Sequence, residues 1–174
     1  VDDEATKDLL VTYTCPEGYY NPLATMFFNT EGGAISSIIS GQESKGVQIS
    51  AWEMFIYMSI WYLFTISTYG VWVPAGLFLP GMIIGCALGS LYELLREDIM
   101  SDTRAHGDYK VTPVIVGAGA MMAGYTRLSY SLVIIMCETT DSINLFVPMM
   151  IAILISRAVS GLFTTSLYDR ALRT

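Results

Sequence analysis

The sequence predicts an all-α, polytopic membrane protein with short, tilted, discontinuous helices, and three observations lead to this fold class. More than half of the 174 residues are apolar and only 14% are charged, whereas about a quarter of the residues of a soluble domain are charged. No charged residue occurs between Glu53 and Glu93, a stretch about twice as long as one helix needs to cross a hydrocarbon core of roughly 30 Å. The later apolar segments are shorter. We therefore expect several membrane-embedded helices, at least two of them between Glu53 and Glu93.

Residues 1–50 are polar and rich in turn formers, so we expect an extramembrane region that precedes the membrane helices of residues 51–174. The apolar runs Pro22 to Phe28 and Ala34 to Ile39 predict one or two small helices against the membrane surface, with Gly32-Gly33 as a break.

The net charge of −7 is concentrated in this first region, which argues against nucleic-acid binding. The chain begins at Val1 with neither an initiator methionine nor a signal-peptide pattern, so we expect a segment of a longer protein. Arg170 and Arg173 predict a cytoplasmic C-terminus.

The first membrane helix is predicted from Met54 to Thr68. Ser50 has the side chain of an N-cap, and Glu53 follows three residues later, as in a capping box. From Tyr69 to Gly81, two prolines and three glycines interrupt an apolar stretch. No helix can run unbroken through that segment.

Helical character resumes from Met82 to Leu95, where Gly85 and Gly89 are four residues apart. Small residues at this spacing let a neighbouring helix approach closely. The segment from Arg96 to Tyr109 is then expected to be a charged connection.

Three further apolar segments are predicted as helices, and a last short helix is expected after Gly161. The three run from Val111 to Tyr125, from Leu128 to Cys137 and from Ile143 to Ile155. At about 10 to 15 residues and 1.5 Å of rise each, most are too short to cross the membrane alone. Charged residues separate them: Arg127, Glu138 with Asp141, and Arg157. This pattern is typical of discontinuous helices packed inside a polytopic protein.

The three cysteines lie in different segments without a CxxC spacing, which indicates neither a metal site nor an internal disulfide. Cys86 and Cys137 are expected to be packing residues, whereas Cys15 could pair with a cysteine outside the chain.

The segment from Val73 to Gly81 breaks a helix without supplying a polar side chain. If Pro80 occupies the first turn of the next helix, the N–H groups of Leu77, Phe78 and Leu79 lie at a helix N-terminus. Unpaired amides are costly in a low-dielectric interior, and an anion is their natural acceptor. The alternative is an ordinary proline kink whose amides are satisfied by neighbouring carbonyls or water.

The stretch Gly76-Leu-Phe-Leu-Pro80 matches the GxFxP motif of the CLC family of chloride channels and chloride/proton exchangers. The resemblance continues through Gly117-Ala-Gly-Ala-Met-Met-Ala-Gly-Tyr-Thr-Arg127, Ser131 to Glu138, Pro148 and Leu167-Tyr-Asp169. In order and spacing these resemble the last third of a CLC membrane domain, which is half of an inverted-repeat transporter. The region from Cys15 to Asn29 resembles the lumenal loop of the endosomal, lysosomal and plant vacuolar branch.

By this resemblance, the amides of Leu77 and Phe78 would bind the central anion, within a loop that includes Gly76, Leu79 and Pro80. The Tyr168 hydroxyl would donate to the anion from the cytoplasmic side; taken alone, Tyr168 could equally be an interfacial aromatic anchor. Neither a metal nor a cofactor is expected, and chloride is the transported ligand.

Other polar residues are interpreted structurally. Arg127 and Glu138 end short helices and resemble packing and interface elements of the family, and His106 is expected to be a solvated surface residue, although it could sense pH. No nucleophile–base–acid arrangement occurs, so enzymatic activity is not predicted.

The resemblance implies chloride transport, with proton-coupled exchange as the leading hypothesis. A passive chloride channel and a non-transporting scaffold subunit are the alternatives. The gate and proton glutamates of the family would lie upstream in the same polypeptide. The helices from Leu128 to Cys137 and from Ile143 to Ser156 would help form a homodimer interface in the lipid membrane of an endosome, lysosome or vacuole.

Overall fold

The computed structural model describes residues 21–43, 49–69, 71, 76–99, 108–140, 143–165 and 172, and its regular elements there are all helical. In chain order the elements are α2 (Pro22–Phe28), α3 (Glu31–Glu43), α4 (Ala51–Thr68), α5 (Phe78–Ile99), α6 (Asp108–Thr126), α7 (Tyr130–Thr140), η1 (Ile143–Leu145) and α8 (Phe146–Phe163). The predicted all-α class is confirmed.

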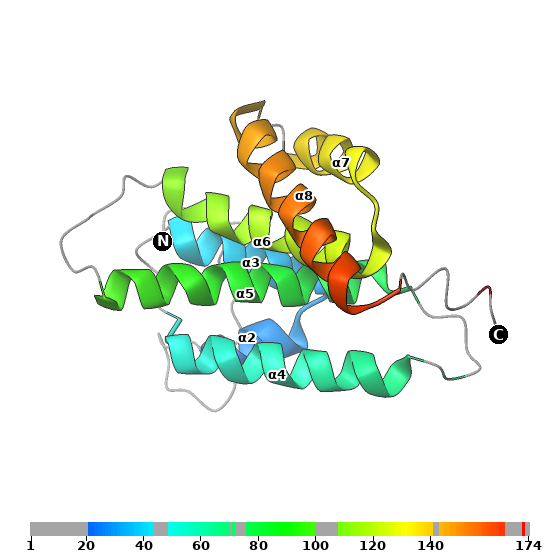
Figure 1. Ribbon diagram of the computed structural model, residues 1–174. Coiled ribbons are helices and arrows are strands. Elements are labelled where there is room, and N and C mark those ends of the chain that lie inside the picture. Colours follow the sequence, from blue (N-terminus) through cyan, green and yellow to red (C-terminus); the bar gives the residue numbers. More distant parts are fainter. Residues whose placement is uncertain are drawn as a thin grey trace.

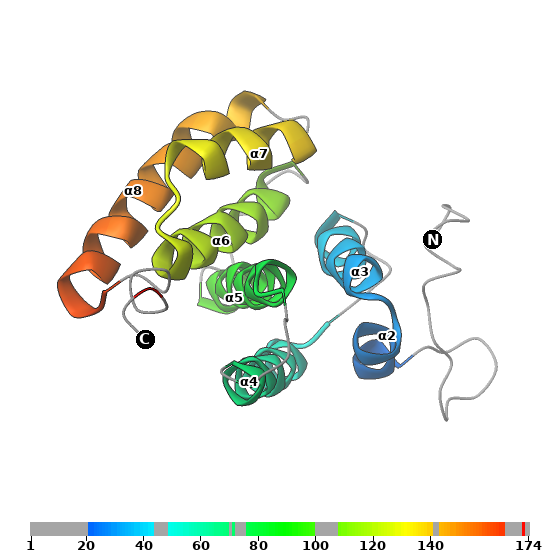
Figure 2. The same ribbon diagram turned by 90° about the vertical axis from the view of Figure 1, so that its right-hand side faces the viewer.

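Helix α6 lies at the centre of the arrangement, with α5 on one side and α8 on another. Helices α4 and α5 run side by side, and α8 crosses α6 obliquely with α7 beside it (Figure 1). Seen from the end in Figure 2, α2 and α3 lie on the opposite side of α5 from α7 and α8. Helix α5 therefore packs against α4 and α6, and also contacts α3.

Helix α4 begins as the sequence predicts. The backbone N–H of Ser50 donates to Glu53 Oε2 at 3.0 Å, so the acidic side chain satisfies a donor that the helix start would otherwise leave free. The helix ends at Thr68, the predicted residue.

The close approach predicted from Gly85 and Gly89 is confirmed, and the approaching helix is α6. A Cβ added at Gly85 would lie 2.6 Å from Ala118 Cα, and one added at Gly89 would lie 2.7 Å from Val114 Cα. On the α6 side, a Cβ at Gly117 would lie 2.6 Å from the Gly85 carbonyl oxygen. Backbone therefore packs directly on backbone between α5 and α6.

The two apolar runs near the N-terminus form helices, but α3 is longer than predicted. Gly32 and Gly33 were expected to form a break and instead lie in its first turn. Thr30 explains the difference, because its hydroxyl accepts from the Gly33 N–H at 3.2 Å and its carbonyl accepts from the Ala34 N–H at 2.8 Å. A capped start offsets the helix penalty of glycine. The side chain of Ile38 then enters the core that α5 and α6 share.

The prediction that the last apolar segment ends at Ile155 is wrong. Helix α8 continues through Arg157 and Gly161 to Phe163. Arg157 does not interrupt the helix because arginine is a good helix former; its exposed guanidinium donates to Ser129 Oγ at 2.8 Å, beside the start of α7. With η1, the continuous segment has 21 residues, enough to cross a membrane.

Within the described residues, two segments are long and apolar enough to span a membrane, Phe78–Arg96 and Ile143–Phe163. Helix α4, predicted as a membrane helix, is not one of these two segments. Near the end of α5 the buried Glu93 forms an ion pair with Arg96, so the carboxylate is compensated where burial would otherwise be costly.

Cys86 and Cys137 are both free thiols. Cys86 lies in the core and Cys137 packs against it, as expected for packing residues. Cys15 and His106 lie outside the described residues.

Candidate anion site at the start of helix α5

The broken segment leads directly into α5, which begins at Phe78 and carries Pro80 in its first turn, the position that the anion hypothesis requires. The helix begins before the predicted Met82 and ends after the predicted Leu95, so the start of the expected charged connection, from Arg96 to Ile99, is helical. The Gly81 N–H donates to the Leu77 carbonyl at 3.3 Å, which is the first backbone bond of the helix. Because proline has no N–H, the helix starts without a donor at residue 80. The remaining donors of the first turn are the amides of Leu77, Phe78 and Leu79.

These three amides lie at the positive end of a 22-residue helix. Within the described residues, none of them donates to a backbone carbonyl of another element. The side chains of Phe78 and Leu79 are exposed, and Gly76 has no neighbour within contact distance of an added Cβ. Amides at such a helix start are suited to a small anion, which could accept from them.

A residue that the sequence interpretation did not single out also contacts this segment. The Tyr125 hydroxyl, in the last turn of α6, donates to the Leu77 carbonyl at 2.9 Å. The two residues are 48 positions apart, so no local spacing could have linked them. The Leu77 carbonyl therefore accepts two hydrogen bonds, one from the Gly81 N–H in α5 and one from the Tyr125 hydroxyl in α6.

Polar contacts also join the end of α6 to the end of α8. Ser156 Oγ donates to the Ala120 carbonyl at 2.6 Å, and Ser160 Oγ donates to the Gly124 carbonyl at 2.5 Å. The Arg127 guanidinium donates to the carbonyls of Ser160 and Thr164. The Ser160 and Thr164 carbonyls lie at the C-terminal end of α8, where the helix dipole favours a cation.

Arg127 itself has a φ of 59°, in the left-handed region that favours glycine. Its N–H donates to the Ala123 carbonyl at 3.0 Å and so caps α6. The backbone strain and the side-chain contacts together indicate that Arg127 is structural, in agreement with the sequence interpretation. Glu138 is exposed in the last turn of α7.

Tyr168 lies outside the described residues, so its proposed contact with the anion remains a prediction. The structure brings Leu77, Phe78 and the unforeseen Tyr125 together. The last described residue before Tyr168 is Thr165, which follows Thr164, whose carbonyl accepts from Arg127.

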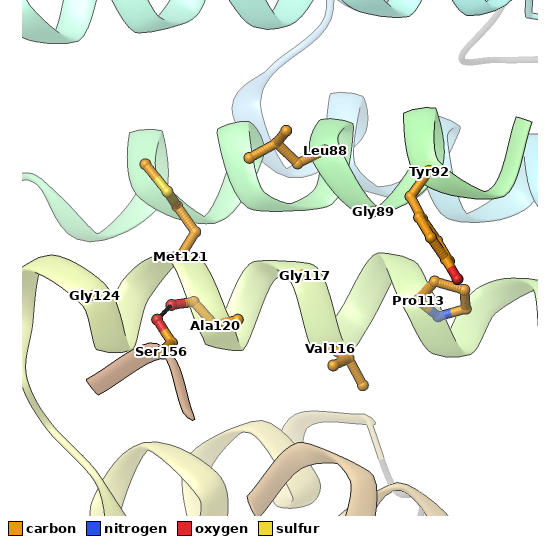
Figure 3. A pocket seen from close by; sticks show the side chains of 10 residues that line it. All are labelled: Leu88, Gly89, Tyr92, Pro113, Val116, Gly117, Ala120, Met121, Gly124 and Ser156. Atoms are coloured by element: carbon orange, nitrogen blue, oxygen red, sulfur yellow. Dashed lines mark hydrogen bonds between the residues drawn. The ribbon is translucent and has the colours of Figure 1, made fainter. Parts of the chain in front are cut away.

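A separate groove of about 500 Å³ lies along α5 and α6 and reaches α8. Figure 3 shows Leu88 and Tyr92 above it and Ser156 below, bonded to the Ala120 carbonyl. Its lining is almost entirely apolar. Gly89 lies 11 residues after Phe78, about 16 Å farther along the helix axis at 1.5 Å per residue. The residues that line the groove do not include Leu77, Phe78 or Leu79, so the groove is not formed by the candidate anion residues.

Comparison with known proteins decides the family. Residues 9–161 match the sequence profile of the family described as "Voltage gated chloride channel". The chain belongs to this family. The match covers α2 to α7 and nearly all of α8, so the start of α5 and its contact with α6 are part of a voltage-gated chloride channel sequence. The family is described by transport and not by catalysis, and its members are integral membrane proteins.

Members of the voltage-gated chloride channel family from plants and animals are similar over most of the chain. The chain is 32% identical over 160 residues to "Chloride channel protein CLC-d" of Arabidopsis thaliana, covering 91% of this chain and 20% of the relative. It is 35% identical over 158 residues to "Chloride channel protein CLC-b" of the same plant, covering 90% and 19%. It is 29% identical over 157 residues to "H(+)/Cl(-) exchange transporter 7" of Bos taurus, covering 89% and 18%. The chain spans about a fifth of the length of these relatives.

Proposed function

We propose that the intact protein transports chloride across a membrane as a proton-coupled exchanger. The observation that carries this proposal is the start of α5, where the amides of Leu77, Phe78 and Leu79 lie at a helix N-terminus in a segment without lysine or arginine. Neutral donors suit a transported ion, because a full positive charge would hold chloride too tightly to release it. The membership of the family supports the same substrate.

In this proposal chloride exchanges part of its water shell for the amides of Leu77 and Phe78 and for the Tyr168 hydroxyl. A tyrosine hydroxyl is a neutral donor that fits the same requirement. Gly76 leaves the approach to the amides free of a side chain, and Pro80 removes one N–H that would need another acceptor. Neither a cofactor nor a metal takes part. The gate and proton-carrying glutamates would come from other parts of the polypeptide.

The first test is chloride flux through the intact protein in reconstituted vesicles. We expect saturable chloride efflux from the parent and a clear change in rate for Tyr168→Trp, because added bulk next to the ion alters its passage. Tyr62→Trp is the matched control, since Tyr62 is an exposed tyrosine of α4. Absence of chloride flux in the parent would overturn the proposal and favour a scaffold that retained the fold. If Tyr168→Trp and the parent transport chloride at equal rates, Tyr168 is not part of the anion site.

A passive channel is the second candidate. The names of the two Arabidopsis relatives favour it, whereas the name of the bovine relative favours exchange. The two can be separated in the same vesicles. An exchanger moves protons uphill when a chloride gradient is imposed, and a channel does not. Uphill proton movement is the expected result.

We also propose that the intact protein crosses an endosomal, lysosomal or vacuolar membrane several times and forms a homodimer there. Helices α7 and α8 carry the apolar surface that such a dimer needs, since Ile134 is 59% exposed and Ile151 is 54% exposed. Both face away from the core of the described chain. A second copy or lipid would cover them.

Ile134→Asp and Ile151→Asp are expected to shift the intact protein in detergent from dimer to monomer, because an unpaired charge in a buried apolar interface costs several kcal/mol. Light scattering coupled to size-exclusion chromatography measures the shift. Ile66→Asp is the control, because Ile66 is also 54% exposed but lies on α4. If Ile134→Asp and Ile151→Asp both remain dimeric, the dimer interface lies elsewhere.

A further inference from the structure

We infer that Tyr125 is a positioning residue for the anion site: its hydroxyl fixes the peptide between Leu77 and Phe78 and so aims the Phe78 N–H. This inference rests on the proposed function. It concerns a residue that would not touch the ion, and it starts from the 2.9 Å hydrogen bond between Tyr125 and the Leu77 carbonyl.

The bond ties two elements that meet at the start of α5. Tyr125 belongs to the last turn of α6, and Leu77 is the residue before α5 begins. The Leu77 carbonyl accepts twice, from Tyr125 and from the Gly81 N–H at 3.3 Å. A carbonyl held by donors from two helices cannot rotate without losing one of them.

Because the peptide unit is rigid, holding the Leu77 carbonyl also fixes the direction of the Phe78 N–H. The Leu77 carbonyl and the Phe78 N–H belong to one peptide unit, which is planar and trans. In such a unit the C=O and N–H point in opposite directions. With the oxygen held toward α6 and the body of α5, the N–H points away from the helix. Donation to the carbonyl also polarises the peptide, which strengthens its N–H as a donor.

Gly81 provides the space that the tyrosine ring needs. A Cβ added at Gly81 would lie 2.7 Å from both Cε1 and Cζ of Tyr125, closer than side-chain atoms can pack, and closer still to the hydroxyl oxygen. The glycine is thus required where the ring passes over α5, which indicates that the two residues act as a pair.

Tyr125 acts through Leu77 and not on the ion directly. Its hydroxyl has one proton, and that proton is donated to the Leu77 carbonyl. A residue in this role should influence how tightly chloride is held while leaving the fold intact.

The test compares Tyr125→Phe with the parent, both as intact protein reconstituted in vesicles, and measures flux against chloride concentration. Removing only the hydroxyl should raise the half-saturating chloride concentration about five-fold, the factor that corresponds to about 1 kcal/mol, the net worth of a typical hydrogen bond. The thermal midpoint in detergent is expected to fall by no more than about 2–4 °C, since the ring and its packing remain. Gly81→Ala should raise the half-saturating concentration in the same way, because the new methyl group displaces the ring. The double variant should be less than additive.

Tyr62→Phe is the matched control, because it removes an exposed tyrosine hydroxyl on α4, and its half-saturating concentration should equal that of the parent. If the parent transports chloride and both Tyr125→Phe and Gly81→Ala saturate at the parental concentration, the positioning role is wrong while the proposed function stands. If Tyr125→Phe fails to fold, Gly81→Ala decides the question. A parent without chloride flux would instead refute the proposed function on which the inference rests.

Discussion

Gly89→Leu is expected to prevent folding of the intact protein or to lower its stability by about 3 kcal/mol or more, at the upper end of what overpacking produces. The side chain would start from a Cβ placed 2.7 Å from Val114 Cα and even closer to the Pro113 carbonyl. Both obstacles are backbone atoms, so no change of rotamer can relieve them. Yield of monodisperse protein and the thermal midpoint in detergent measure the effect.

Gly161→Leu is the matched control for that substitution. Gly161 lies within α8, and an added Cβ there meets no atom within 4 Å. Leucine is also a better helix former than glycine by roughly 0.8 kcal/mol, so the control should be as stable as the parent or slightly more so. A Gly89→Leu protein as stable as this control would show that α5 and α6 do not pack backbone on backbone.

Arg127→Ala is expected to destabilise the protein by about 2–3 kcal/mol, because hydrogen bonds from charged donors contribute roughly 1.5–3 kcal/mol. The variant removes the guanidinium from the carbonyls of Ser160 and Thr164, and it leaves an alanine at a φ of 59°. Thermal unfolding of the intact protein measures the loss.

Arg127→Gly separates the side-chain contacts from the backbone strain. It loses the same donors but adopts the left-handed conformation without the roughly 1–2 kcal/mol that other residues incur there. We therefore expect stability to decrease in the order parent, Arg127→Gly, Arg127→Ala. An alanine variant at least as stable as the glycine variant would contradict the conformation assigned to residue 127.

The features that the sequence predicted correctly are those whose physical causes lie within a few residues of one another. The capping of α4 needs only Ser50 and Glu53, and the start of α5 needs only Pro80 and the absence of polar side chains before it. The spacing of Gly85 and Gly89 predicted a close helix, although it could not identify α6 as that helix. The all-α class and the order of the elements follow from such local patterns.

The features that the sequence did not predict depend on contacts between distant segments. The Arg157 guanidinium in α8 donates to Ser129, 28 positions away, beside the start of α7. The Tyr125 hydroxyl donates to the Leu77 carbonyl, 48 positions away. No sequence pattern within either segment predicts this contact. Of the candidate anion residues, Leu77 and Phe78 lie where the sequence placed them, whereas the anion itself and Tyr168 remain predictions.

The glycine contacts between α5 and α6 have a mechanical consequence. Helices separated by a layer of side chains can slide by small changes of rotamer, but Gly85, Gly89 and Gly117 provide no such layer. The two helices should therefore travel as one rigid body through any transport cycle. If the ion path opens and closes, the movement must then occur where α4 packs against α5 and α8 packs against α6, because larger side chains separate those helices.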